Sequence, residues 1–444
     1  MKFKKILLTV AAPTLTIVAA AATVSCFGGK KSKYKKIANS EELNAYLKTM
    51  ISGIKPLSEI SENWTASVQK EKPLLITDEG DTNDKSFNQS SWEALELLQK
   101  QYGVKVKTVK PTGGFAQAYS NALDDGSTLW VLSGFKHGDP ITKWLKENNR
   151  WKQVKAQNIK IVAVDFDLGD QELKAQLPNF YSLQYNTREG GWMAGYASAK
   201  FLAQKYAKQP ERRVVATFGG GAFPGVYDFN IGYLRGILDW NEQNPTLKVK
   251  HGNDLNLDSG FEPGDKMTSS VQDAINTAGV SIVLPVAGPA TGVVLAELNK
   301  IPTKKDVYVI GVDVDQSNTY VSDKGRLATS ITKGLGQSVY DIISDIALKG
   351  TEEYEPKFDK NERTSSFSYV GDAQNNWTGV ADATLANEDD NSKMNEALSE
   401  ARSKFTKLSA EDKEFIASYK LTKNSEPIKS GSELLGKLIE KSNN

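Results

Sequence analysis

The sequence predicts an α/β protein built from two parallel, doubly wound sheets with a ligand cleft between them. From residue 73 onward, short β-branched segments alternate with longer amphipathic segments. Repeated alternation of strand and helix produces parallel sheets that are covered by helices. The pattern contains about ten strands, which is many for a single sheet. Because the polar segment 186–191 divides these strands into two sets, we expect two lobes.

The expected elements follow one another in that alternation. We expect strands at 74–77, 104–109, 129–133, 159–165, 181–185, 213–218, 247–251, 281–286, 307–311 and 327–331. We expect helices that include 91–102, 191–207, 227–241, 265–278, 291–298 and 336–348. Ligands of such sheets bind beyond the carboxyl ends of the strands, so the loops that follow the strands are where a site is expected.

The first 25 residues predict export and lipidation. Three lysines near the start precede an apolar run over 6–24, and the run ends directly before Ser25 and Cys26, the only cysteine in the chain. This is the order of an export signal and its cleavage site. The run approaches the ~20 residues of a membrane span, but Pro13 and the small-residue-Cys ending argue against one. We therefore expect a lipid anchor on Cys26 that holds the protein on the extracytoplasmic face of the cell membrane.

The rest of the chain is long enough for two domains with additions. Fifty-five Lys and Arg residues balance 54 Asp and Glu residues, so no basic field predicts a nucleic-acid partner, and we expect a monomer. We expect the following division: a signal peptide at 1–25, a lipidated tether with a possible helix at 26–72, lobe 1 at 73–187 plus about 315–350, lobe 2 at 188–314, and a mostly helical C-terminal extension at 351–444.

The loop after the first strand, 78–90, is the richest in functional side chains. It combines four acidic residues with amides and one aromatic residue, Phe87. An acidic loop that only caps a helix, through Asn88 or Ser90, is the simpler interpretation. A cap requires one such residue and explains neither the four acids nor Phe87. The loop is therefore a candidate binding element that includes Asp78.

A glycine-rich loop at 219–225 follows the sixth strand. Its spacing differs from a dinucleotide fingerprint, because Pro224 stands where the third glycine belongs. Glycines here would let the backbone approach a ligand, on which Phe223, Tyr227 or Phe229 would stack. Core packing of any one of these aromatic residues is an equally open alternative.

Three later strands end in loops with polar groups. Gly288 lies where a helix begins, and free N–H groups at such a position bind ligand oxygens. Asp313 and Lys333 each follow another strand. Carboxylates accept hydrogen bonds from paired hydroxyls and an ammonium donates to them, so this set suits a vicinal diol. A solvated acidic loop with an exposed lysine is the alternative.

Seven motifs occur in order between residues 72 and 350. They are TDEG at 77–80 with DKSFNQSSWE at 84–93, GGWMAGY at 190–196, GG at 219–220, FNIGYLRG at 229–236, PVAG at 285–288, IGVDVDQS at 310–317 and TSITK at 329–333. With these motifs the chain resembles the basic membrane protein family, the PnrA-like nucleoside-binding lipoproteins of bacterial ABC importers. The resemblance implies a type I periplasmic-binding-protein-like fold whose lobes close on a purine nucleoside.

The resemblance also implies roles for residues at the base. Phe87 and an aromatic residue of the second lobe, Phe229 in our interpretation, would sandwich the base. Asp78 and Asn88 would lie at the base side, and Asp165 would read its hydrogen-bonding edge. Stacking contributes about 1–3 kcal/mol per base, so these rings would supply much of the affinity.

At the ribose, the resemblance implies contacts from Asp313 and Lys333, with the backbone of Gly288 beside them. Two positions depart from the family pattern: Glu79 replaces a small or neutral residue, and Pro289 replaces a glycine. These departures bear on the identity of the ligand and leave its class unchanged. A lone lysine among acidic residues compensates a phosphate poorly, which favours a nucleoside over a nucleotide.

We expect the lobes to close about hinges near 185–187, 314–317 and 334–338. Closure would bury the ligand and present a surface to the permease subunits of the importer. ATP would be hydrolysed by separate subunits, because the chain contains no Gly-Lys-Ser/Thr phosphate loop.

Two other functions are open at this stage. A calcium-dependent nucleoside hydrolase would need the acidic loop to hold a cation, but Lys85 and Phe87 interrupt it, and His137 and His251 lie away from catalytic positions. We therefore expect no enzyme activity, catalytic residue, metal or cofactor. A surface-exposed adhesin or immunogenic lipoprotein that kept the fold is the second alternative.

Overall fold

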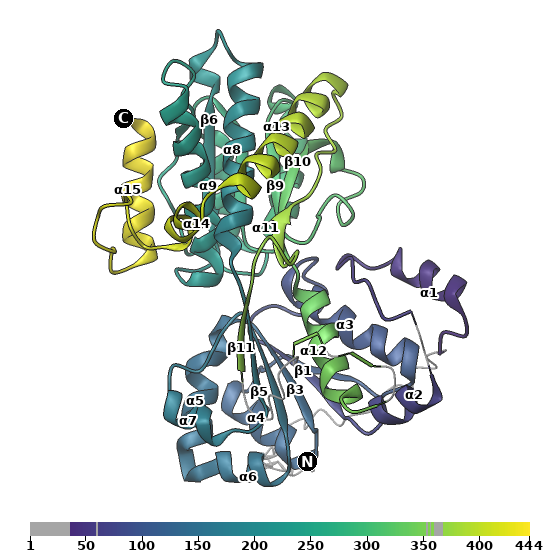
Figure 1. The fold of residues 1–444 in the computed structure, drawn as a ribbon. Helices are drawn as coiled ribbons and strands as arrows, with labels where there is room; N and C mark the ends of the chain where they lie inside the picture. The colour runs from purple at the N-terminus through teal and green to yellow at the C-terminus, as the bar shows by residue number, and fades with distance from the viewer. Residues whose placement is uncertain (1–35, 59–60, 352–353, 356, 359–366) are drawn as a thin grey trace, which may run out of the picture. The chain divides into compact units, whose positions relative to one another are not determined.

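The computed structural model describes residues 36–444 except 59–60, 352–353, 356 and 359–366. The predicted signal peptide and Cys26 lie outside the described residues. The described chain contains two six-stranded sheets, sheet A in the order β11-β5-β4-β3-β1-β2 and sheet B in the order β12-β10-β9-β8-β6-β7. Helices cover both sheets (Figure 1). The predicted α/β class with two sheets is confirmed.

The strands agree well with the predicted positions. Sheet A contains β1 (Pro73–Thr77), β2 (Lys107–Val109), β3 (Leu129–Ser133), β4 (Lys160–Val164), β5 (Phe180–Tyr185) and β11 (Phe367–Gly371). Sheet B contains β6 (Val214–Gly219), β7 (Lys250–His251), β8 (Val280–Val286), β9 (Tyr308–Asp313), β10 (Leu327–Lys333) and β12 (Thr378–Val380). The described strand pairs are parallel except β10 with β12. The ten predicted strands correspond to β1–β10.

The central strands are apolar on both faces because helices cover both faces. In β1, all five residues are buried. Leu74 and Ile76 belong to one apolar cluster and Leu75 to another, as expected when successive side chains point to opposite faces. Burial of one such side chain contributes roughly 1.5–3 kcal/mol, so the two clusters fix which face each strand residue occupies.

The helices fall into two groups by the sheet on which they pack. The first lobe contains α1 (Ser40–Leu47), α2 (Glu62–Val68), α3 (Phe87–Tyr102), α4 (Phe115–Asp124), α5 (Gly138–Lys146), α6 (Arg150–Ala156), α7 (Gln171–Gln176) and α12 (Leu335–Leu348). The second lobe contains α8 (Thr187–Lys205), α9 (Pro224–Gln243), α10 (Asp265–Asn276), α11 (Ala290–Asn299), α13 (Glu388–Lys407), α14 (Ala410–Ala417) and α15 (Gly431–Asn443).

Helices α8 and α9 pack at very short range through glycines. A Cβ at Gly195 would lie 1.9 Å from the carbonyl oxygen of Tyr233, and one at Gly236 would lie 2.1 Å from that of Trp192. Gly191 and Gly232 make similarly close approaches to the opposite helix. The two glycine pairs therefore set the distance between α8 and α9, and α9 carries aromatic residues toward the site.

The chain crosses between the sheets at three places, which corrects the predicted lobe boundaries. Crossings follow β5 at Asn186, β10 at Gly334 and β11 at 372–377. The crossings at 186 and 334 coincide with two predicted hinges. The third predicted hinge, at 314–317, lies between β9 and β10, which both belong to sheet B. Of the segment 315–350 that we assigned to lobe 1, only α12 packs there, against α2 and α3.

The C-terminal residues are part of the lobes and do not form a separate extension. Strand β11 pairs with β5 and strand β12 with β10. Helices α13 and α15 pack on α8 and α9. Two buried arginines fix the loop after α14: Arg188 donates to the carbonyls of Ala417 and Ser418, and Arg235 to those of Ser418 and Lys420. Helices α13, α14 and α15 lie within the segment 351–444 that we predicted to be mostly helical.

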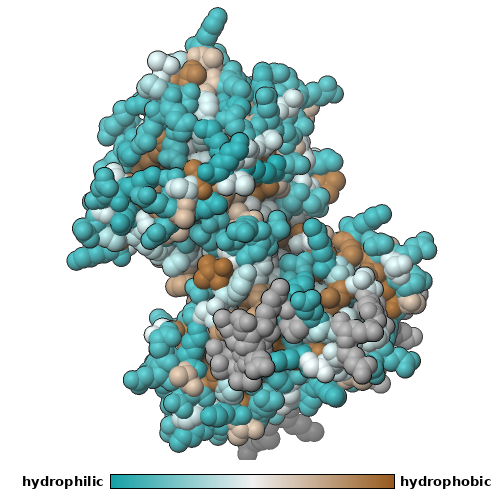
Figure 2. Space-filling view, viewed as in Figure 1, coloured by the Kyte–Doolittle hydropathy of each residue, from teal (hydrophilic) through white to brown (hydrophobic). Residues whose placement is uncertain are grey.

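The surface of the described residues is largely polar. Figure 2 shows mostly hydrophilic side chains on this face, with apolar side chains in small separate groups. Among the described residues, Val321 and Val370 are the exposed large hydrophobic residues. This face therefore presents no broad apolar patch.

Candidate ligand site at the carboxyl ends of both sheets

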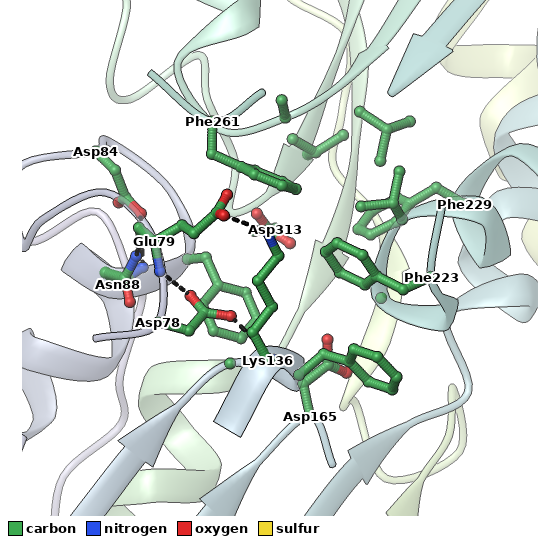
Figure 3. Close-up of a pocket in the computed structure, with 18 of the residues that line it drawn as sticks. Asp78, Glu79, Asp84, Asn88, Lys136, Asp165, Phe223, Phe229, Phe261 and Asp313 are labelled. Carbon is green, nitrogen blue, oxygen red and sulfur yellow. Dashed lines mark hydrogen bonds and ion pairs between the residues drawn. The ribbon is translucent and has the colours of Figure 1, made fainter. Parts of the chain in front are cut away.

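A cavity lies where the carboxyl ends of the two sheets meet (Figure 3). Its empty space, counted up to the open mouth and including open solvent, is about 600 Å³. The ends of β8 and β9, the loops after β1, β3, β4, β6, β7 and β8, and the first turns of α3 and α9 supply the lining. The lining residues are Asp78, Glu79, Asp84, Phe87, Asn88, Gly134, Phe135, Lys136, Asp165, Phe223, Gly225, Val226, Phe229, Phe261, Val286, Ala287, Pro289, Val312 and Asp313.

Asp84 organises the acidic loop and caps α3. Its carboxylate accepts hydrogen bonds from the backbone N–H groups of Ser86, Asn88 and Gln89, at 2.8–3.1 Å. The cap predicted at Asn88 or Ser90 is therefore supplied by Asp84, which satisfies N–H groups at the helix start. The side-chain amide of Asn88 donates to the carbonyl of Glu79 at 2.7 Å. The buried Oδ1 of Asn88 has no partner among the described residues.

Asp78 is held at the end of β1 in a position that burial makes unfavourable for a charge. Its carboxylate accepts from the backbone N–H of Glu79 at 2.6 Å and from that of Lys136 at 3.4 Å. Burial raises the pKa of Asp78 to about 7, although these hydrogen bonds oppose the rise. Gly134 is required beside it, because a Cβ there would lie 1.9 Å from the Asp78 carboxylate. Asp78 is therefore poised to titrate near neutral pH.

Replacing Asp78 with asparagine is expected to raise the free energy of unfolding by about 3 kcal/mol more at pH 8 than at pH 5. The folded-state pKa lies above the unfolded value of 3.8. The wild-type contribution is therefore full below the unfolded pKa and is lost as pH rises to about 7. Urea denaturation at both pH values measures the difference. The exposed Asp254→Asn variant is the control, and an equal gain for Asp78→Asn at both pH values would contradict the explanation.

Two aspartates occupy matching places in the two sheets. Asp165 directly follows β4 and Asp313 is the last residue of β9, and each strand is third from the same end of its sheet. Both have left-handed backbone conformations, with φ of 68° and 66°. A non-glycine residue in this region is uncommon and strained. Asp tolerates this conformation better than most residues do. Here it occurs at both Asp165 and Asp313, which line the cavity.

Lys333, at the end of β10, joins the two sheets. Its ammonium lies 2.9 Å from Asp165 Oδ2, and its side chain is almost fully buried. Ser86, from the loop before α3, makes a second link by donating to Asp313 Oδ2 at 2.6 Å. Burial raises the pKa of Asp313 to about 6, while Lys333 and Ser86 oppose the rise. Lys333 itself faces a larger, adjoining part of the cleft.

The aromatic candidates differ in whether they line the cavity. Phe87 and Phe229 both line the cavity, and their ring centroids lie 5.6 and 5.1 Å from the Lys333 ammonium. Phe223 also lines the cavity and stacks on Phe135. Tyr227 is not among the lining residues and packs instead against Tyr419 and Gly431. Of the three second-lobe candidates, Phe223 and Phe229 therefore line the cavity and Tyr227 does not.

Residues 72–355 match the Bmp family model, described as "ABC transporter substrate-binding protein PnrA-like". The chain belongs to this family. The predicted resemblance is therefore confirmed, and the family is one of substrate-binding proteins of ABC transporters.

Individual relatives of this Bmp family member are distant. The "ABC transporter nucleoside-binding protein BmpA" of Lactococcus lactis is 26% identical over 63% of this chain and 74% of its own length. The "Uncharacterized lipoprotein MG040" of Mycoplasma genitalium is 22% identical over 70% of this chain and 67% of its own length. A solute-binding protein of an ABC transporter system from Aeropyrum pernix has a TM-score of 0.58 at 18% identity, covering 83% of this chain and 91% of that one. This structural likeness supports the type I periplasmic-binding-protein-like fold.

Seven of the eight predicted ligand-binding residues of this Bmp family chain lie in the cleft. Six of these line the enclosed cavity, and Lys333 lies in the adjoining part. Gly288 is not among the lining residues, although Ala287 and Pro289 on either side of it are. Its carbonyl accepts from Gln316 Nε2 at 3.1 Å, and it packs against Ser86. Close packing therefore accounts for glycine at 288.

Several lining residues of the cavity were not predicted. Phe135 and Lys136 directly follow β3, so the rule that sites form at strand ends applies to them. Phe261 lies in an irregular segment between β7 and α10, where the sequence pattern gives no signal. Glu79 was noted only as a departure from the family pattern. These residues meet on one side of the cavity.

No group of three or more His, Cys, Asp or Glu side chains in the described part of the chain is placed to hold a metal ion. None of the helices in the described ranges is long and apolar enough to cross a membrane.

Proposed function

We propose that this protein is the extracytoplasmic, lipid-anchored receptor of an ABC importer and that it binds a purine nucleoside in the cavity. The observation that carries this proposal is the combination of Phe87 and Phe229 with Asp313, Asp165 and Lys333 in one cleft. A nucleoside offers a flat aromatic base and a vicinal diol, which these two kinds of side chain complement. The name of the Lactococcus relative, a nucleoside-binding protein, supports the ligand class.

The polar groups support separate roles at the two ends of the ligand. The unpaired Oδ1 of Asn88 is a buried acceptor, which costs free energy unless a donor reaches it. A base N–H is such a donor, and Asp78 lies on the same side of the cavity. Asp313 and Lys333 would bind the ribose hydroxyls, and Asp165 would read the base edge. The roles of Asp165 and Lys333 are coupled, because their side chains form an ion pair.

Binding would be linked to movement of the lobes about the crossings at 186, 334 and 372–377. Asp165 follows a strand of sheet A, whereas Asp313 and Lys333 end neighbouring strands of sheet B. Asp165 would therefore meet the other two only when the lobes are together. Closure would then give the permease subunits a surface that differs between the loaded and unloaded receptor. The anchor on Cys26 would keep the receptor at the membrane.

Calorimetry of the purified full-length chain against adenosine, guanosine, free nucleobases and ribose tests the proposal. We expect saturable nucleoside binding that Phe87→Ala weakens roughly 5- to 150-fold through loss of stacking. Asp313→Ala is expected to weaken it roughly 10- to 100-fold through loss of charged hydrogen bonds to the ribose.

Two nearby variants serve as controls for this experiment. Asp315→Asn removes a charge from the turn after β9 but keeps the size of the side chain, and Tyr227→Phe changes an aromatic residue outside the cavity. Both are expected to bind as the wild type does. Absence of nucleoside binding by folded wild-type protein would overturn the proposal and favour the surface-interaction role, whereas release of free base would favour a hydrolase.

A further inference from the structure

Lys136 reaches from one lobe onto aromatic rings of the other. It follows β3 of sheet A, and its ammonium lies 5.9 Å from the ring centroid of Phe223 and 5.8 Å from that of Phe261. Both rings belong to loops of the second lobe and lie 5.8 Å apart. Figure 3 shows the Lys136 side chain extended across the cavity between these groups. A cation over two ring faces is attracted to both.

Two further contacts hold this arrangement. The ammonium forms an ion pair with Glu79, which comes from the loop after β1 in the same lobe. The preceding residue, Phe135, stacks on Phe223 with ring planes 3° apart and centroids 5.1 Å apart. Consecutive residues of one loop therefore contact the opposite lobe, one through its ring and one through its charge.

The charges explain why Glu79 and Lys136 occur together. The cavity lining contains several other carboxylates, and Lys136 is its only cation among the described residues. Glu79 orients the ammonium and neutralises it, so the pair adds no net charge to a site that suits a neutral ligand. Exposed ion pairs alone contribute little to stability. The effect of Lys136 should therefore come from its contact with the rings of the other lobe.

We propose that Lys136 is a positioning residue that clasps the two lobes over bound nucleoside and sets the rate of release. This inference rests on the proposed function of the cavity. Its contacts with Phe223 and Phe261 exist only while the lobes are together. Loss of the clasp therefore speeds opening, and with it release, while entry into the open receptor is little affected.

Stopped-flow measurement of adenosine and guanosine release from the purified full-length chain tests the clasp. Lys136→Met keeps most of the side-chain stem and removes the charge. We expect it to raise the dissociation rate constant roughly 3- to 30-fold and to change the association rate constant less than about 2-fold. Lys136→Arg should restore slow release, because a guanidinium also stacks on aromatic rings. A merely structural role for Lys136 would not produce this division between the two rate constants.

The matched control is Lys110→Met. Lys110 also reaches across the cleft, where it forms an ion pair with Glu262 at 2.5 Å, but both side chains are largely exposed. We expect Lys110→Met to change release less than about 2-fold. Equal effects of the two methionine variants, or no effect of Lys136→Met, would overturn the clasp.

A second readout tests the clasp without any nucleoside. Spin labels at Lys155→Cys in α6 and Lys300→Cys after α11, in a Cys26→Ser background, report the distance between the lobes. Lys136→Met should shift the distance distribution to longer values, and Lys110→Met should not. If wild-type protein binds no nucleoside, the proposed function fails while this measurement still decides the clasp. An unchanged distribution in Lys136→Met would overturn it.

Discussion

Replacement of Gly195 by alanine is expected to lower the free energy of unfolding by about 3 kcal/mol, although alanine favours helices. The added Cβ would lie 1.9 Å from the carbonyl oxygen of Tyr233 and 3.0 Å from its Cα. These are backbone atoms inside α9, so no side-chain rotation relieves the contact. Helices α8 and α9 must therefore move apart. Because protein interiors are close-packed, this movement breaks contacts between neighbouring apolar side chains and leaves cavities between them.

Guanidinium denaturation followed by circular dichroism measures this loss. Gly436→Ala is the matched control, because Gly436 also lies within a helix, α15, but a Cβ there meets nothing within 4 Å. Alanine at 436 should therefore stabilise the protein by up to about 1 kcal/mol. If Gly195→Ala were as stable as wild type, the close approach of α8 and α9 would not be a constraint on the fold.

Strands β1–β10 and helices α3 and α8–α12 could be predicted because the signal is local, whereas no range was predicted for α4–α7. Each central strand is a short apolar run and most of the predicted helices are longer and amphipathic, so length and periodicity together separate them. The edge strands show the limit of this signal. Strand β2 begins at Lys107 and not at 104, and β7 keeps only Lys250 and His251. These two strands are shorter than predicted because each lies at the edge of its sheet and pairs with a neighbour on one side only.

Local sequence pattern could not predict that the C-terminal segments add strands to the two sheets. Strand β11 is half exposed, with burial alternating along Phe367–Gly371, and β12 has only three residues. What makes them strands is pairing with β5 and β10, which are far away in sequence. The same long-range pairing carries the chain from sheet A back to sheet B at 372–377, so the third crossing was placed at 314–317 in error.

The site was predictable where a residue directly follows a strand. Asp78, Asp165, Asp313 and Lys333 all lie at strand ends, and the structure places them in one cleft. Phe261 lies outside that rule, because only the folding of an irregular segment brings it to the cavity. The rule that sites form at strand ends thus identifies side chains whose position is set by the sheet. It does not identify side chains whose position depends on the folding of a loop.

Replacement of Lys333 by methionine is expected to lower the free energy of unfolding by about 3–5 kcal/mol at pH 8. The Lys333 side chain is 1% exposed and pairs with Asp165 at 2.9 Å. Methionine fills the space of the stem but leaves the carboxylates of Asp165 and Asp313 without their cation. Breaking a buried pair costs more than the pair contributes, because the remaining charges stay desolvated. Denaturation at pH 8, with the exposed Lys266→Met variant as control, measures this penalty.

The penalty should decrease as pH falls, and this pH dependence distinguishes lost charge compensation from lost packing. Burial already raises the pKa of Asp313 to about 6, and Lys333 opposes that rise. Without Lys333 the pKa of Asp313 rises further, so the folded variant takes up a proton that the unfolded chain releases at the same pH. Proton uptake on folding stabilises the variant toward lower pH, and the difference from wild type should be smaller at pH 5 than at pH 8. An equal penalty at both pH values would assign it to packing around Phe87 and Phe229, and the ammonium would then have no electrostatic role in joining the sheets.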